Sequence, residues 1–130
     1  MGECNTRYED GLAVRREVLG DAYVDHALAG ADELGEPLQK LVTEYCWGSV
    51  WTREGLDRKT RSLLNVAMLS ALNRPAELAI HLLGALRNGC TADELREVVL
   101  QIAIYAGVPA GIEAMRHLRK ALEEHEAQAQ

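Results

Sequence analysis

The stretch that decides the fold is RKTRSLLNVAMLSALN, residues 58–73, the most apolar part of the chain. Its Leu, Val, Ala and Met residues leave almost no polar face, and they do not alternate with polar residues as they would in a half-buried strand. A helix that is apolar all round is buried on several sides. One domain of 130 residues can hardly surround such a helix, so the stretch predicts a helical core and an oligomer.

Apolar residues recur at helical spacing before this stretch, and breaks that contain glycine separate them. The pattern predicts helices over 8–19, 21–28 and 37–47. A loop is expected over 48–55, between two glycines, and it holds Trp51. No convincing strand pattern interrupts this part of the chain.

Helices are also expected after the apolar stretch, over 75–88, 91–106 and 110–124. Pro75 suits the first turn of a helix, and Thr91 to Glu94 reads as a capping box. The polar tail, 123–130, is expected to fray. The sequence therefore predicts an all-α single domain, 1–130, with six or seven helices and an ordered core over about 8–122.

The net charge of the chain disfavours two classes of binding partner. The chain has 20 acidic and 14 basic residues, and its net charge is −6. A surface of that sign repels nucleic acid and acidic membranes, so neither is an expected partner. It also repels small anions, so a site for an anionic substrate must be locally basic.

The three cysteines, Cys4, Cys46 and Cys90, are odd in number and widely spaced, with no Cys-x-x-Cys motif. This spacing disfavours a disulfide framework and a structural zinc site. The polar residues 1–16 do not resemble a signal peptide, and no apolar run reaches the roughly 20 residues that span a bilayer. A cytoplasmic protein with reduced thiols is expected.

Several stretches match a known family, and the match covers about residues 8–114. They are YEDGL (8–12) with RREVLGD (15–21), WGSVWTREGL (47–56) with KTRSLL (59–64), ALNR (71–74) with Glu77-Leu78 and His81-Leu82, and VVLQIAIY (98–105) with GVPA (107–110). In these stretches the chain resembles the 4-carboxymuconolactone decarboxylase family, within the alkylhydroperoxidase D-like superfamily. The resemblance implies an alkylhydroperoxidase D-like helical fold and a homo-oligomer, either a trimer or a hexamer.

The resemblance also implies a reaction, the decarboxylation of 4-carboxymuconolactone to 3-oxoadipate enol-lactone and CO2 in the breakdown of protocatechuate. The substrate is a small anionic lactone, and the lactone carbonyl accepts the electrons that CO2 leaves behind. The implied reaction therefore requires no cofactor and no metal. The protein must bind one carboxylate, desolvate the other, stabilise the developing oxyanion and protonate carbon.

His81 is the first candidate for this chemistry. Glu77 precedes it by four residues and Arg74 by seven, so all three share one helical face if Arg74 lies at the helix edge. The hypothesis makes His81 the proton donor, Glu77 the residue that sets its tautomer and pKa, and Arg74 an anion-binding residue. The alternative is a core histidine beside a surface ion pair.

Four more residues are candidates for substrate binding. Arg61 either clamps a substrate carboxylate or forms a salt bridge at a helix end or a subunit interface. Trp47 and Trp51, four residues apart, either wall a flat lactone pocket or anchor a core or an interface. The hydroxyl of Tyr105 either lines the site or caps backbone.

The chain departs from the family pattern at Ala106, where relatives have Cys, and at Gly111-Ile112, where they have Ala-Asn. These changes leave open a related lactone or keto-acid decarboxylase with another specificity. A thiol peroxidase is disfavoured because Arg74 and Glu77 stand where the superfamily's redox cysteines would be, and Ser62 where its relay glutamate would be. A non-enzymatic helical oligomer is the remaining alternative.

Overall fold

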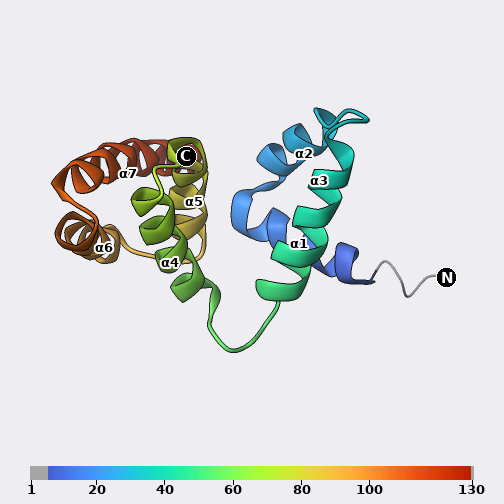
Figure 1. The fold of residues 1–130 in the computed structure, drawn as a ribbon, viewed down its shortest axis with the longest axis horizontal. Coiled ribbons are helices and arrows are strands. Elements are labelled where there is room, and N and C mark those ends of the chain that lie inside the picture. The colour runs from blue at the N-terminus through green and yellow to red at the C-terminus, as the bar shows by residue number, and fades with distance from the viewer. Residues whose placement is uncertain (1–5, 130) are drawn as a thin grey trace. The chain divides into compact units, whose positions relative to one another are not determined.

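The computed structural model describes residues 6–129 (Figure 1). Within this range every regular element is a helix, which confirms the all-α prediction. The chain divides into two compact units, Met1–Leu56 and Asp57–Gln130. Cys4 and Gln130 lie outside the described residues. The oligomeric state and the domain bounds stay predictions.

The first unit holds α1 (Thr6–Leu19), α2 (Asp21–Ala29), α3 (Glu36–Leu41) and the π-helix η2 (Val42–Val50). α1 packs along η2, and α3 runs directly into η2. Gly20 separates α1 from α2 with a φ of 91°, a left-handed conformation that glycine adopts without strain. The glycine that was expected to stop the first helix therefore also turns the chain into the second.

Gly48 lies inside a helix, and the prediction of a loop from this residue was wrong. η2 continues through Gly48 to Val50, and Trp51 is the residue that caps it. A Cβ atom at Gly48 would lie 2.4 Å from the backbone oxygen of Arg7 in α1. Glycine is needed here because the backbones of α1 and η2 approach each other closely, and not because the helix ends.

The second unit holds α4 (Arg58–Ala71), α5 (Pro75–Arg87), α6 (Ala92–Tyr105) and α7 (Val108–Ala129). α4 packs against α5 and α6, and α7 packs against the same two helices (Figure 1). Each helix contributes at least one side chain that is at most 2% exposed, and these form the centre of the core: Val66, Leu78, Leu82, Leu95 and Leu118.

The apolar stretch over residues 58–73 is buried on one side only. Val66 is fully buried, whereas Leu64 is 46% exposed and Met68 is 50% exposed. The expectation that a helix apolar all round is covered on several sides is therefore not met within one chain. Covering of the exposed side by a second subunit stays a prediction.

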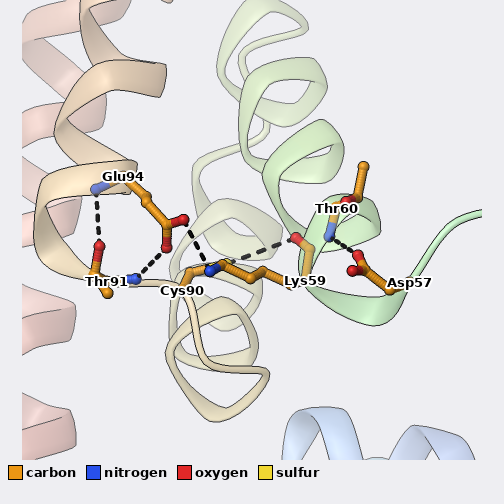
Figure 2. Close-up of polar contacts among 6 residues, drawn as sticks. All are labelled: Asp57, Lys59, Thr60, Cys90, Thr91 and Glu94. Atoms are coloured by element: carbon orange, nitrogen blue, oxygen red, sulfur yellow. Dashed lines mark hydrogen bonds and ion pairs between the residues drawn. The ribbon is translucent and has the colours of Figure 1, made fainter.

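Polar contacts hold the start of α4 against the start of α6 (Figure 2). Asp57 caps α4 by accepting a hydrogen bond from the backbone N–H of Thr60, at 2.8 Å. Thr91 and Glu94 form the predicted capping box of α6. The second carboxylate oxygen of Glu94 lies 2.8 Å from Nζ of Lys59 in α4. One glutamate therefore both caps its own helix and links it to a neighbouring helix.

The last helix runs further than the sequence pattern indicated. α7 begins at Val108, includes Pro109 in its first turn, and ends at Ala129 instead of near Glu124. Ala121 is buried, Leu122 packs on the core, and Gln128 accepts a hydrogen bond from Arg87 at 3.3 Å. Tertiary contacts thus support a segment that its polar composition alone marked as frayed. Between residues 6 and 129, no helix has both the length and the apolar character needed to cross a membrane.

Candidate functional site

The candidate site lies on the seam between α4 and α5. These helices are joined by a short turn and pack side by side, so they run antiparallel. Asn65 and His81 each lie near the middle of their helix. The amide nitrogen Nδ2 of Asn65 is 3.4 Å from Nδ1 of His81. Asn65 was not among the residues singled out from the sequence.

The environment of His81 keeps its ring uncharged at neutral pH. Burial lowers the pKa of His81 to about 4, because the charged imidazolium loses its hydration. The nearby charge of Glu77 raises the pKa, but by less than burial lowers it. His81 is therefore a neutral imidazole at pH 7, which can donate or accept a hydrogen bond but holds no extra proton to give away.

Two of the predicted site residues flank the Asn65–His81 pair. Arg61 lies one turn before Asn65 on α4, and Glu77 lies one turn before His81 on α5. Because the two helices are antiparallel, Arg61 and Glu77 are on opposite sides of the pair along the seam. Arg61 is partly buried, whereas Glu77 is exposed. By helical spacing, Arg61 shares a face of α4 with Asn65, and Glu77 shares a face of α5 with His81.

Arg74 does not continue this row within the helix. It is the residue before α5, with φ −117° and ψ 75°, and its Nη1 donates to the carbonyl oxygens of Leu72 (3.1 Å) and Asn73 (3.4 Å). Its side chain lines a separate cavity of about 250 Å³ together with residues of α7 that include Glu113. Helical spacing alone placed Arg74 on the face of His81, but the guanidinium folds back onto the turn.

Tyr105 and the residues that depart from the family pattern lie elsewhere in the second unit. Tyr105 is 82% exposed and, with Ala106, borders an apolar groove of about 490 Å³ between α4 and α6. His81 does not line this groove. Ile112 is exposed on α7, and a Cβ atom at Gly111 would lie 2.7 Å from the Cβ of Ala103 on α6. Gly111 therefore allows a close approach of α6 and α7.

The two tryptophans pack against each other in the first unit. Trp47 and Trp51 are 2% and 5% exposed, and their rings stack with centroids 4.8 Å apart and an angle of 26° between the planes. This arrangement accounts for both residues as packing partners in that unit. Their contact with substrate stays a prediction.

A buried arginine in the first unit escaped the sequence analysis. Arg15 is only 4% exposed, and its Nη1 donates to the hydroxyl of the fully buried Thr43 at 3.1 Å. Its Nε is also buried and has no hydrogen-bond partner in residues 6–129. Its neighbour Arg16 is more exposed and pairs with Asp21 and Asp25. The spacing of Arg15 from Val18 and Gly11 on one helical stripe was the signal that could have revealed it.

The cysteines of the described region are not equipped for thiol chemistry. Cys90 is 4% exposed, and its Sγ lies 3.6 Å from the backbone oxygen of Lys59 (Figure 2). Burial is the main cause that raises the pKa of Cys90 to about 11. Loss of hydration also raises the pKa of the Cys46 thiol, and it outweighs the charge of Arg15 and the contact with Trp51, which both lower that pKa. Both thiols are therefore protonated at neutral pH, and reactive cysteines need the opposite.

His81 makes stability depend on pH. Its pKa is about 4 in the folded chain and 6.5 in the unfolded chain, so between these values the unfolded chain binds the proton more readily. The contribution of His81 to the unfolding free energy is therefore fully present above pH 6.5 and is lost as the pH falls towards 4. We expect wild type to lose about 3 kcal/mol of unfolding free energy through this group between pH 7 and pH 4.

Urea denaturation of wild type and of His81→Gln at pH 7, 5.5 and 4 measures this effect as the difference between the two proteins. His26→Gln, at an exposed histidine of α2, controls for the loss of one imidazole. If wild type and His81→Gln lose the same unfolding free energy on acidification, the folded chain does not shield the His81 ring from protonation.

Comparison with known proteins shows which family the chain is similar to. Residues 36–124 match the model of the Carboxymuconolactone decarboxylase family, so the match runs through both units. The chain is 45% identical to 4-carboxymuconolactone decarboxylase of Acinetobacter baylyi over 109 residues, which is 84% of this chain and 81% of that protein. It is 44% identical to nitrosuccinic acid decarboxylase of Metarhizium robertsii over 117 residues, 90% of this chain and 82% of that protein.

The chain belongs to the carboxymuconolactone decarboxylase family. Both relatives are named as decarboxylases, which supports a carboxy-lyase activity. Their names differ in the acid that loses CO2, so family membership identifies the class of reaction but not the substrate.

Proposed function

We propose that this protein decarboxylates 4-carboxymuconolactone to 3-oxoadipate enol-lactone and CO2. The observation that carries the proposal is the neutral, partly buried His81 on the α4–α5 seam, in contact with Asn65, with Arg61 one turn before Asn65 on α4. The 45% identity to the Acinetobacter enzyme supports the same substrate.

The reaction requires a hydrogen-bond donor for the developing oxyanion and a group that binds the remaining carboxylate, and His81 and Arg61 are suited to these two roles. Loss of CO2 sends an electron pair through the double bond into the lactone carbonyl, where negative charge develops on oxygen. An uncharged imidazole in a poorly hydrated setting can hydrogen-bond to that oxygen more effectively than water can. The guanidinium of Arg61 is suited to the carboxylate that remains, because a guanidinium binds a carboxylate through two parallel hydrogen bonds. The lactone is its own electron sink, so the proposed reaction needs no cofactor.

Nitrosuccinic acid is the second candidate substrate, because the Metarhizium relative matches 90% of this chain. The two acids share their essential chemistry. Each carries a second carboxyl group, and in each the electrons left by CO2 come to rest on oxygen, either of a lactone carbonyl or of a nitro group. A hydrogen-bond donor beside a carboxylate-binding arginine serves both reactions, so the residue set by itself does not separate them.

The test is CO2 release and the change in ultraviolet absorbance with each acid in turn. 4-Carboxymuconolactone is generated in place, and spontaneous decarboxylation at the same pH is subtracted. We expect enzyme-dependent turnover of the lactone, with kcat/KM at least about 10⁴ M⁻¹s⁻¹. Turnover of nitrosuccinate alone would assign the second substrate. A folded protein that turns over neither acid would overturn the proposal.

A further inference from the structure

We propose that Asn65 is a positioning residue that holds His81 in the tautomer whose proton is on Nε2. His81 then presents an N–H donor on the edge of its ring away from Asn65. That this donor serves the oxygen on which charge builds up during loss of CO2 rests on the proposed function. The assignment of the tautomer does not.

The assignment follows from which atoms can donate. The contact joins Nδ2 of Asn65 to Nδ1 of His81 at 3.4 Å. An amide nitrogen carries two protons and has no lone pair to offer, so Asn65 must be the donor and Nδ1 the acceptor. A neutral imidazole has only one ring proton. With Nδ1 accepting, that proton is on Nε2.

The positions of Asn65 and His81 in the fold favour one fixed orientation of the two side chains. Asn65 and His81 project from the middle of two packed helices, and both side chains are partly buried. Rigid elements hold a pair of side chains more precisely than loops do. The uncharged amide also fits the electrostatics of the seam, because it orients the ring without stabilising the imidazolium form. A carboxylate at position 65 would accept a hydrogen bond from Nδ1–H, and so it would favour a proton on Nδ1.

The tautomer changes the role expected of His81. The sequence suggested a proton donor tuned by Glu77, whereas the geometry points to a hydrogen-bond donor oriented by Asn65. In the proposed reaction the bond between carbon and the leaving carboxylate breaks, and its electron pair moves to the acceptor oxygen, which the Nε2–H group stabilises. CO2 departs, and the carbon then takes a proton that is supplied by solvent. His81 keeps its own proton throughout, and the net change is one carboxylate and one proton to one C–H bond and CO2.

The direct test is the ¹⁵N NMR spectrum of protein labelled at the histidine ring nitrogens, recorded at pH 7 without substrate. Wild type is expected to show His81 protonated at Nε2 and unprotonated at Nδ1. Asn65→Asp should place a proton on Nδ1, and Asn65→Leu, which has a similar volume and no donor, should give a mixture. Asn73→Asp makes the same change of charge at an exposed residue just after α4 and should leave the His81 signals as in wild type.

A wild-type His81 protonated at Nδ1, or signals that Asn65→Leu and Asn65→Asp both leave unchanged, would overturn the proposal. If Asn65→Asp does not fold, Asn65→Ser replaces it, because the shorter hydroxyl can only partly restore the donor and should give a spectrum between those of wild type and Asn65→Leu. Circular dichroism of each variant shows that the comparison is made on folded protein.

Kinetics separate this inference from the proposed function. With an acid that wild type decarboxylates, Asn65→Leu should lower kcat by about 10- to 100-fold with little change in KM, because a mispositioned ring weakens the transition state more than the ground state. A wild-type Nε2–H signal without turnover of either acid defeats the proposed function and leaves the assignment of the tautomer intact. Turnover by a protein whose His81 is protonated at Nδ1 defeats the assignment of the tautomer and leaves the proposed function intact.

Discussion

Replacing Gly11 by alanine is expected to destabilise the first unit by about 4 kcal/mol. A Cβ atom at this position would lie 2.1 Å from the backbone oxygen of Thr43, 2.7 Å from the backbone nitrogen of Gly48 and 2.9 Å from its Cα. All three atoms belong to the backbone of η2, so no side-chain rotation relieves the clash. α1 must move away from η2, and the buried Val14 and Val18 lose their packing.

The sign of this effect makes the experiment decisive. Inside a free helix, alanine is more stable than glycine by about 1 kcal/mol, so local propensity predicts a small gain from the same substitution. Urea denaturation followed by tryptophan fluorescence measures the outcome, since both tryptophans are in the first unit. Gly48→Ala should behave like Gly11→Ala, because its Cβ would lie 2.4 Å from the backbone oxygen of Arg7.

Gly55→Ala is the matched control for these variants. No atom lies within 4 Å of a Cβ atom built at Gly55, and its φ is outside the left-handed region. This variant should stay within about 0.5 kcal/mol of wild type. A Gly11→Ala protein as stable as the Gly55→Ala protein would show that the crossing of α1 and η2 is looser than described.

Replacing His81 by alanine is expected to lower kcat/KM by about 10³-fold with the acid that the protein decarboxylates. The variant loses the uncharged imidazole of the α4–α5 seam, and water that enters in its place is a poorer, less ordered donor. His81→Gln should lose less activity, because a glutamine amide can still present an N–H group. This order, wild type above glutamine above alanine, is what a hydrogen-bond donor predicts.

The rates are measured by the absorbance assay at pH 7, with His26→Gln as the control that removes an exposed imidazole from α2. The control should keep wild-type activity. Equal activity of His81→Ala and wild type would remove His81 from the mechanism and would leave the family's carboxy-lyase chemistry to other residues. Equal losses in the glutamine and alanine variants would count against the donor role.

The sequence was informative wherever a structural signal is local. The capping box at Thr91 and Glu94 forms as expected, because its two hydrogen bonds join residues three positions apart. Pro75 is the first residue of α5. Gly89 follows the end of this helix and has a φ of 94°, a conformation that other residues seldom adopt. The all-helical class and the place of His81 on α5 follow from the same periodic spacing.

The tertiary structure decided the features that depend on residues far apart in the sequence. Gly48 reads as a break in isolation, yet the approach of α1 keeps it within η2. Arg74 shares a helical face with His81 only in an ideal helix, whereas its actual position before α5 turns it towards the carbonyls of the turn. The partner of His81 is 16 residues away, on the other helix of a hairpin.

Periodicity and capping thus determined which segments are helices and which of them carries the imidazole, because both are properties of neighbouring residues. The ionisation of His81 and the orientation of its ring were decided by packing, since burial lowers its pKa and Asn65 contacts it across the seam. Desolvation and contacts between helices arise only when distant segments meet, and no spacing along one helix contains them.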